Sequence, residues 1–116
     1  MKSTILLAVK ALLTVVFVMA GAMKMIGNPM MVETFDTIGV GQWFRYVTGI
    51  IEVVGGILLW VPNRQFIGAG LLFCTMVCAV AAHAIWLGMD TALPAVVLGL
   101  LAGYVLLAHK DQQPAR

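Results

Sequence analysis

The chain of 116 residues is 62% hydrophobic and only 10% charged, with a net charge of +2 and a mean hydropathy of +1.03. A soluble domain is about 45–50% apolar and about 25% charged, so this composition excludes a disordered chain and a soluble enzyme. The small, unclustered positive charge excludes a nucleic-acid partner, and the apolar composition points to the lipid bilayer.

Four apolar segments separated by short turn sequences dominate the chain. They cover residues 5–26, 44–61, 66–87 and 91–108. Each is near the length that crosses a hydrocarbon core of about 30 Å, and within lipid a helix satisfies its own backbone hydrogen bonds. The sequence therefore predicts an all-α fold, a bundle of four transmembrane helices forming one domain over residues 1–116.

The first segment admits a second interpretation as a signal peptide. Lys2 precedes it, and Ala20, Gly21 and Ala22 resemble a cleavage site. Its apolar run exceeds the usual 7–15 residues of such peptides, however, and is interrupted by Lys10. These two features favour a retained membrane helix.

Residues 27–43 form the longest loop between the segments. Apolar residues recur there at roughly helical spacing while the acids occupy another face: Met30, Met31, Phe35 and Ile38 against Glu33 and Asp36. This pattern predicts a short amphipathic helix in the outer interface, ending at Gly39 or Gly41. Trp43 and Tyr46 follow it, where aromatic residues typically anchor a helix to the interface.

Glu52 is the most unusual residue of the second segment. It shares one helical stripe with Arg45, Gly49 and Gly56, and Thr48 borders that stripe. Eight residues past the segment start, Glu52 is expected about 12 Å deep, where an ionisable group is costly unless paired, protonated or hydrated. We favour a site residue facing the bundle interior over a neutral glutamic acid bonded to Thr48 or to a neighbouring helix.

His83 is expected in the same half of the bilayer, about 6 Å from the outer end of the third segment. If the two stripes face each other, Glu52 and His83 can share a proton, since histidine changes charge near neutral pH. Alternatively, His83 is an interfacial residue bonded to a loop carbonyl. Lys24 can add positive charge beside Glu52 or extend to lipid phosphate, and the second role is favoured for Lys24 alone.

Other residues with chemical potential are better explained by packing. Cys74 and Cys78 lack the CxxC spacing of a redox pair and are expected to be inert, buried residues. The eight methionines form no cluster with cysteine or histidine, so no metal site is expected. Small residues at 95, 99 and 103 allow close helix contacts, either within the bundle or in a homodimer.

Charges in the loops and toward the ends of the segments predict the orientation. One side holds Lys2, Arg64, Lys110 and Arg116, with Lys10 nearby, and the other holds Lys24 and Arg45 together with three acids. Because cytoplasmic loops carry an excess of Lys and Arg, both termini are expected in the cytoplasm.

Three blocks between residues 24 and 52 carry a family resemblance: KMIGNP, MVxxF and GVGQWFRYxTGxxE. Downstream, LLxxP at 58–62, GA at 68–69, MxxA at 76–79 and His83 continue it. The chain resembles the DoxX-like family of small four-helix membrane proteins over nearly its whole length. The resemblance carries over Lys24, Gly27, Pro29, Gly49, Glu52 and His83 as motif residues without assigning their roles.

The resemblance implies an integral protein of the cell inner membrane. Better-known relatives are linked to sulfur or thiosulfate oxidation, which feeds electrons to quinone, and to membrane oxidoreductase complexes. We therefore expect a redox-associated subunit whose outward-facing intramembrane pocket holds a quinone-like or other lipophilic molecule. The candidate ligand-binding residues are Glu52, His83, Lys24, Arg45, Thr48, Gln42 and Trp43.

Other functions stay open from the sequence. The chain carries no visible electron carrier, so a membrane oxidoreductase partner or the substrate must supply electrons. A small proton-coupled transporter, a lipid-binding module and a non-catalytic assembly partner are the alternatives. No catalytic residue is assigned, and whether the chain is an enzyme is left open.

Overall fold

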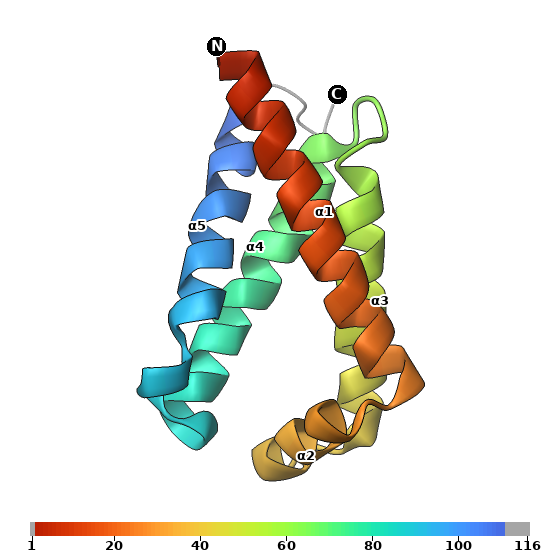
Figure 1. Ribbon diagram of the computed structural model, residues 1–116, viewed down its shortest axis with the longest axis vertical. Coiled ribbons are helices and arrows are strands. Elements are labelled where there is room, and N and C mark those ends of the chain that lie inside the picture. The colour runs from red at the N-terminus through yellow and green to blue at the C-terminus, as the bar shows by residue number, and fades with distance from the viewer. Residues whose placement is uncertain (1, 111–116) are drawn as a thin grey trace.

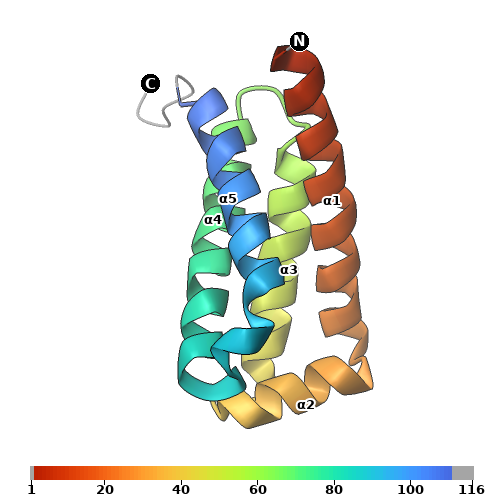
Figure 2. The ribbon, with the colours of Figure 1, turned by 60° about the vertical axis from the view of Figure 1, so that its left-hand side comes forward.

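The computed structural model describes residues 2–110, in which every regular element is a helix. Four long helices run side by side: α1 (Lys2–Ile26), α3 (Gln42–Leu58), α4 (Gln65–Ala82) and α5 (Leu93–Ala108). The shorter α2 (Pro29–Ile38) lies across the end of the bundle remote from the chain termini (Figures 1 and 2). The all-α fold is confirmed, whereas Arg116, used above for orientation, lies outside the described residues.

The predicted helix within the 27–43 loop is present as α2. The side chain of Asn28 accepts a hydrogen bond from the Met30 backbone nitrogen at 3.0 Å, and Pro29 occupies the first turn. The helix ends where Gly39 adopts a left-handed conformation with φ of 83°, which favours glycine. Phe35 and Ile38 are buried, but Met30 is 62% exposed, so the apolar face is narrower than expected.

Two helix boundaries differ from the predicted segments. The second segment was expected to continue to residue 61, but α3 ends at Leu58 and residues 59–63 form turns. Pro62 explains the early end, because proline disfavours a helical conformation at the residue before it. The third segment is longer than α4 alone, since a π-helical turn (His83–Leu87) continues the rod, and a 3-10 turn (Met89–Thr91) then leads to α5.

The helices expose their apolar side chains to the outside. Within the described residues, two helical stretches are long and apolar enough to cross a membrane, Thr4–Ile26 and Gln65–Leu87, and only 17% and 11% of their best windows are buried. The core helix of a soluble protein would be mostly buried, so this exposure favours lipid as the surrounding medium. With 17 and 16 residues, α3 and α5 are shorter than a full span, and lengths alone do not confirm four crossings.

The bundle consists of two helix pairs that diverge toward the end at which α2 lies. α1 packs on α3 and α4 packs on α5, and Figure 1 shows the pairs close together at the terminal end and apart at the other. The hydrophobic core is made of buried side chains from α1, α4, α5 and the turn after α3, among them Leu13, Phe17, Leu59, Leu72 and Val105.

Small residues of α5 pack within the chain. A Cβ built on Gly99 would lie 3.3 Å from the Cβ of Met76, and one on Gly103 would lie 3.3 Å from the Phe73 ring. Both neighbours belong to α4. The small-residue stripe of the fourth segment therefore has a partner inside the bundle.

Candidate functional site

A pocket of about 420 Å³ lies between α3 and α4, on the α2 side of the bundle. Most of its walls are apolar side chains of these three helices, including Met31, Phe35, Ile38, Ile51, Leu71 and Met76. Its volume falls within the range of small-molecule sites, which are about 300–1,000 Å³ and mostly apolar. The helix α2, within residues 27–43, thus forms one wall of the pocket.

Two glycines explain why the pocket forms at this end. At the opposite end, Gly55 of α3 and Gly68 of α4 bring the helices together, since a Cβ on Gly68 would lie 2.8 Å from the Gly55 carbonyl oxygen. Toward α2, larger side chains such as Phe44 and Val47 line the space between the helices instead. The crossing is therefore tight at one end and open at the other.

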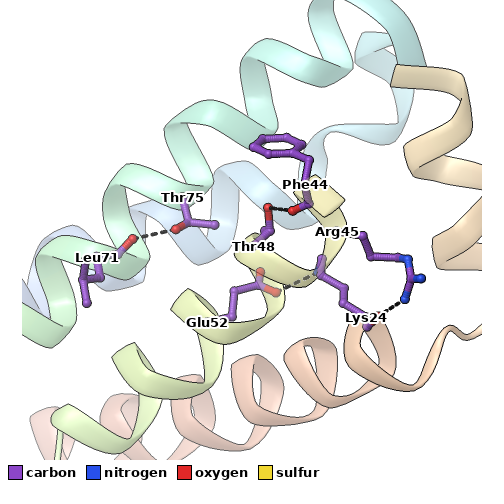
Figure 3. A network of polar contacts seen from close by, with 7 residues as sticks. All are labelled: Lys24, Phe44, Arg45, Thr48, Glu52, Leu71 and Thr75. Atoms are coloured by element: carbon purple, nitrogen blue, oxygen red, sulfur yellow. Dashed lines mark hydrogen bonds and ion pairs between the residues drawn. The ribbon is translucent and has the colours of Figure 1, made fainter. Parts of the chain in front are cut away.

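Lys24 and Glu52 form a buried ion pair at the pocket. The Lys24 Nζ donates to Glu52 Oε1 at 2.7 Å, and the two side chains are only 11% and 3% exposed (Figure 3). Both residues line the pocket. Taking two charges out of water is costly, so the pair needs close geometry to persist.

Close contact between α1 and α3 creates this geometry. A Cβ on Gly21 would lie 2.6 Å from the Gly49 carbonyl oxygen, and one on Gly49 would lie 3.1 Å from Lys24 Cβ. Glycine at these positions lets the backbones approach and leaves room for the lysine stem beside α3. The interpretation of Lys24 as a residue extending to lipid phosphate is wrong, because its face of α1 packs on α3.

Arg45 lies behind the ion pair and outside the pocket lining. It is buried, its Nη1 donates to the Lys24 carbonyl oxygen, and its Nε donates to Gln42 Oε1 at 2.7 Å. A cation at the end of α1 complements the carbonyl groups left unpaired there. Its guanidinium also stacks on Tyr46, 4.4 Å from the ring centroid.

Gln42 connects this network to α2. Its Nε2 donates to the Val32 carbonyl oxygen at 3.0 Å and to Asp36 Oδ1 at 2.7 Å. Like Arg45, Gln42 does not line the pocket. The two residues instead hold α1, α2 and α3 in position around it.

Thr48 and His83 both line the pocket. Thr48 lies one turn before Glu52 on α3, and its hydroxyl donates to the Phe44 carbonyl oxygen at 2.9 Å. His83 begins the π-helical turn after α4. Glu52 and His83 thus line the same pocket, and the ion-pair partner of Glu52 is Lys24.

Trp43 stands apart from the other candidate residues. It is 59% exposed, and its Nε1 donates to the Val40 carbonyl oxygen at 3.2 Å. The side chain does not line the pocket. This position is compatible with the interfacial anchoring that the sequence also suggested.

The pocket also contains residues to which the sequence analysis assigned other roles or none. Cys74 and Cys78 line it and are exposed, so the expectation that they are buried in packing is wrong. Thr75 of α4 and Thr34 of α2 are further polar lining residues that spacing did not distinguish. Within residues 2–110, no three His, Cys, Asp or Glu side chains gather to hold a metal ion.

Comparison with known proteins gives one match. The family described as DoxX-like matches residues 8–106, which include all of the candidate site. No curated protein and no solved structure matches the chain.

Proposed function

This chain belongs to the DoxX-like family, and from that premise we propose that it is a redox-associated inner-membrane subunit that binds a quinone-like or other lipophilic molecule. The ligand occupies the pocket between α2, α3 and α4. All four long helices cross the bilayer, and both termini are cytoplasmic.

One observation carries this proposal: a buried ion pair lies in the wall of a mostly apolar pocket. Ionisable residues at membrane depth are costly and usually mark functional sites. The apolar walls suit a lipophilic ring or chain, and a small number of polar groups orients its head.

Proton handling supports the redox-associated role. Glu52 and His83 line one pocket, and both side chains are able to exchange protons. The chain itself supplies no electron carrier, so electrons come from the ligand or from a partner protein. A partner oxidoreductase would dock on the exposed apolar helices within the membrane.

The distribution of charge supports the topology. Arg64 and Lys110 lie at the terminal end of the bundle, while Glu33, Asp36 and Asp90 lie at the other end. Excess positive charge favours the cytoplasmic side. The bundle is 40 Å along its longest axis, close to the roughly 40–45 Å of a whole bilayer with headgroups.

The pocket is tested by filling it. Purified protein is placed in lipid nanodiscs, and retention of a short-chain quinone is measured against empty nanodiscs. Ala79→Phe places a large ring in the pocket lining and should weaken binding at least about tenfold, whereas Ala81→Phe changes an exposed residue of the same helix outside the lining and should not. Equal binding by both variants and the unmodified chain would contradict the site.

A further inference from the structure

We propose that the pocket selects ligands by a hydrogen-bond donor, so that a hydroxyl-bearing ring, such as a phenol or a hydroquinone, binds in preference to a quinone or an ether. This inference rests on the proposed lipophilic-ligand site and specifies the chemistry of the head group. It follows from the hydrogen bonds that the threonines and the carboxylate of the wall already make.

Three threonines line the pocket, and all three hydroxyl protons are used within their own helices. Thr34 donates to the Met30 carbonyl oxygen at 2.8 Å, Thr48 to that of Phe44 at 2.9 Å, and Thr75 to that of Leu71 at 2.7 Å. A hydroxyl group has one proton and two acceptor lone pairs. What these threonines still offer to a ligand is therefore an acceptor.

Glu52 adds a charged acceptor to the same wall. One carboxylate oxygen accepts from Lys24 at 2.7 Å, and an ionised carboxylate has no proton to donate. An ionised carboxylate has about four lone-pair sites on its two oxygens, and the bond from Lys24 uses one of them. The carboxylate thus retains capacity for a donor on the ligand.

These acceptors converge on one region of the pocket. Thr48 and Glu52 are one helical turn apart on α3, and Thr75 of α4 lies on the other side of the space (Figure 3). Lys24 reaches Glu52 from α1, on the side away from Thr75, and its ammonium group donates into the carboxylate. The bond to Glu52 therefore uses one of the three N–H donors of Lys24, while Thr48, Thr75 and Glu52 together offer the larger number of acceptors to a head group.

These acceptors distinguish rings that carry a hydroxyl group from similar rings that do not. A phenol or hydroquinone donates a proton to these oxygens, whereas a quinone or a methyl ether brings only lone pairs toward them. Hydrogen bonds to charged groups are stronger than neutral ones, and a site built to bond a hydroxyl rejects an analogue that lacks it. We expect a preference of at least about tenfold for the hydroxyl form.

A pair of ligands differing by one methyl group tests this selection. A 4-alkylphenol and its methyl ether are titrated into the protein in nanodiscs, and binding is followed by protection of Cys74 and Cys78, which line the pocket, from alkylation. The phenol should protect at a concentration at least about tenfold lower than the ether. A short-chain hydroquinone and its quinone, compared without oxygen, should show the same order.

Threonine variants locate the source of the preference. Thr48→Val and Thr75→Val remove an acceptor and should each reduce the preference about threefold to tenfold, while Thr48→Ser and Thr75→Ser retain the hydroxyl and should preserve it. Thr37→Val is the matched control, because Thr37 donates to the Glu33 carbonyl oxygen at 3.1 Å in the same way but does not line the pocket.

The outcomes separate the two proposals. Equal protection by phenol and ether, stronger protection by the ether or the quinone, or a preference unchanged in both valine variants would overturn donor selection while leaving the lipophilic site in place. If no ligand protects the cysteines and Ala79→Phe also leaves quinone retention unchanged, the proposed function itself is wrong.

Discussion

At the scale of single residues, the ion pair between Lys24 and Glu52 is the feature on which the site depends. A charge at membrane depth is tolerated when it is paired, and here both partners are almost completely buried. Breaking a buried pair leaves one uncompensated charge, which costs more than replacing both members by apolar side chains. Removing one member of the pair is therefore expected to destabilise the protein, whereas replacing both members by apolar side chains is expected to cost little stability.

We predict that Glu52→Gln destabilises the bundle by about 3–5 kcal/mol, because the Lys24 ammonium loses its counter-charge. The double change Lys24→Met with Glu52→Leu should recover most of that loss, although ligand binding should remain impaired. Thermal unfolding in detergent measures both effects. Glu33→Gln, on an exposed residue of α2, is the control and should leave the unfolding temperature unchanged.

At the scale of the helices, close contacts between glycines determine which faces meet. Between lipid-exposed helices there is little hydrophobic driving force, so packing depends on small residues that let backbones approach. Gly21 and Gly49 bring α1 onto α3, and Gly55 and Gly68 bring α3 onto α4. The contact between Gly21 and Gly49 brings Lys24 beside Glu52. The contact between Gly55 and Gly68 closes one end of the α3–α4 crossing, and the pocket lies at the other end, toward α2.

A methyl group added at the contact between Gly21 and Gly49 should push α1 and α3 apart. For Gly21→Ala we predict a destabilisation of about 1–3 kcal/mol, because the new Cβ would lie 2.6 Å from the Gly49 carbonyl oxygen, which is backbone and cannot rotate away. Gly70→Ala is the matched control, since its Cβ would meet only Leu106 at an ordinary 3.7 Å. Equal unfolding temperatures for the two variants would argue against a tight α1–α3 contact.

At the scale of the whole molecule, polar contacts concentrate at two levels. The site surrounds Glu52 near α2, while Lys10, toward the terminal end, lies 5.1 Å from the centroid of the Trp60 ring. Trp60 also donates to the Thr14 hydroxyl at 2.7 Å, which connects α1 to the turn after α3. Between these levels the outer surface is apolar, as expected for helices that cross the hydrocarbon core.

This arrangement predicts that the turn after α3 and the helix α2 lie on opposite sides of the membrane. In a chain whose two native cysteines are replaced by alanine, Pro62→Cys should react with an impermeant maleimide only from the cytoplasm. Thr37→Cys should react only from the other side. Labelling of intact cells and of inverted vesicles distinguishes the two. Reaction of both positions from the same side would show that α3 does not cross.

The amino-acid sequence by itself determined the local features of this protein. Apolar runs and turn residues are read along the chain, so they predicted an all-α fold, and the spacing of Phe35 and Ile38 before Gly39 predicted a helix in the long loop. Strong amphipathic periodicity in α3 likewise identified the buried face that carries Arg45, Gly49 and Glu52.

Only the tertiary structure decided which of these residues meet. α4 and α5 are apolar on nearly every side, so their periodicity shows no preferred face, and the exposure of Cys74 and Cys78 along a pocket could not be read from spacing. Lys24 was misassigned for a related reason: whether a lysine near a helix end extends to lipid or pairs inward depends on the neighbouring helix. That neighbour is set by contacts between residues far apart in sequence, and the fold alone brings Gly21 and Gly49 together.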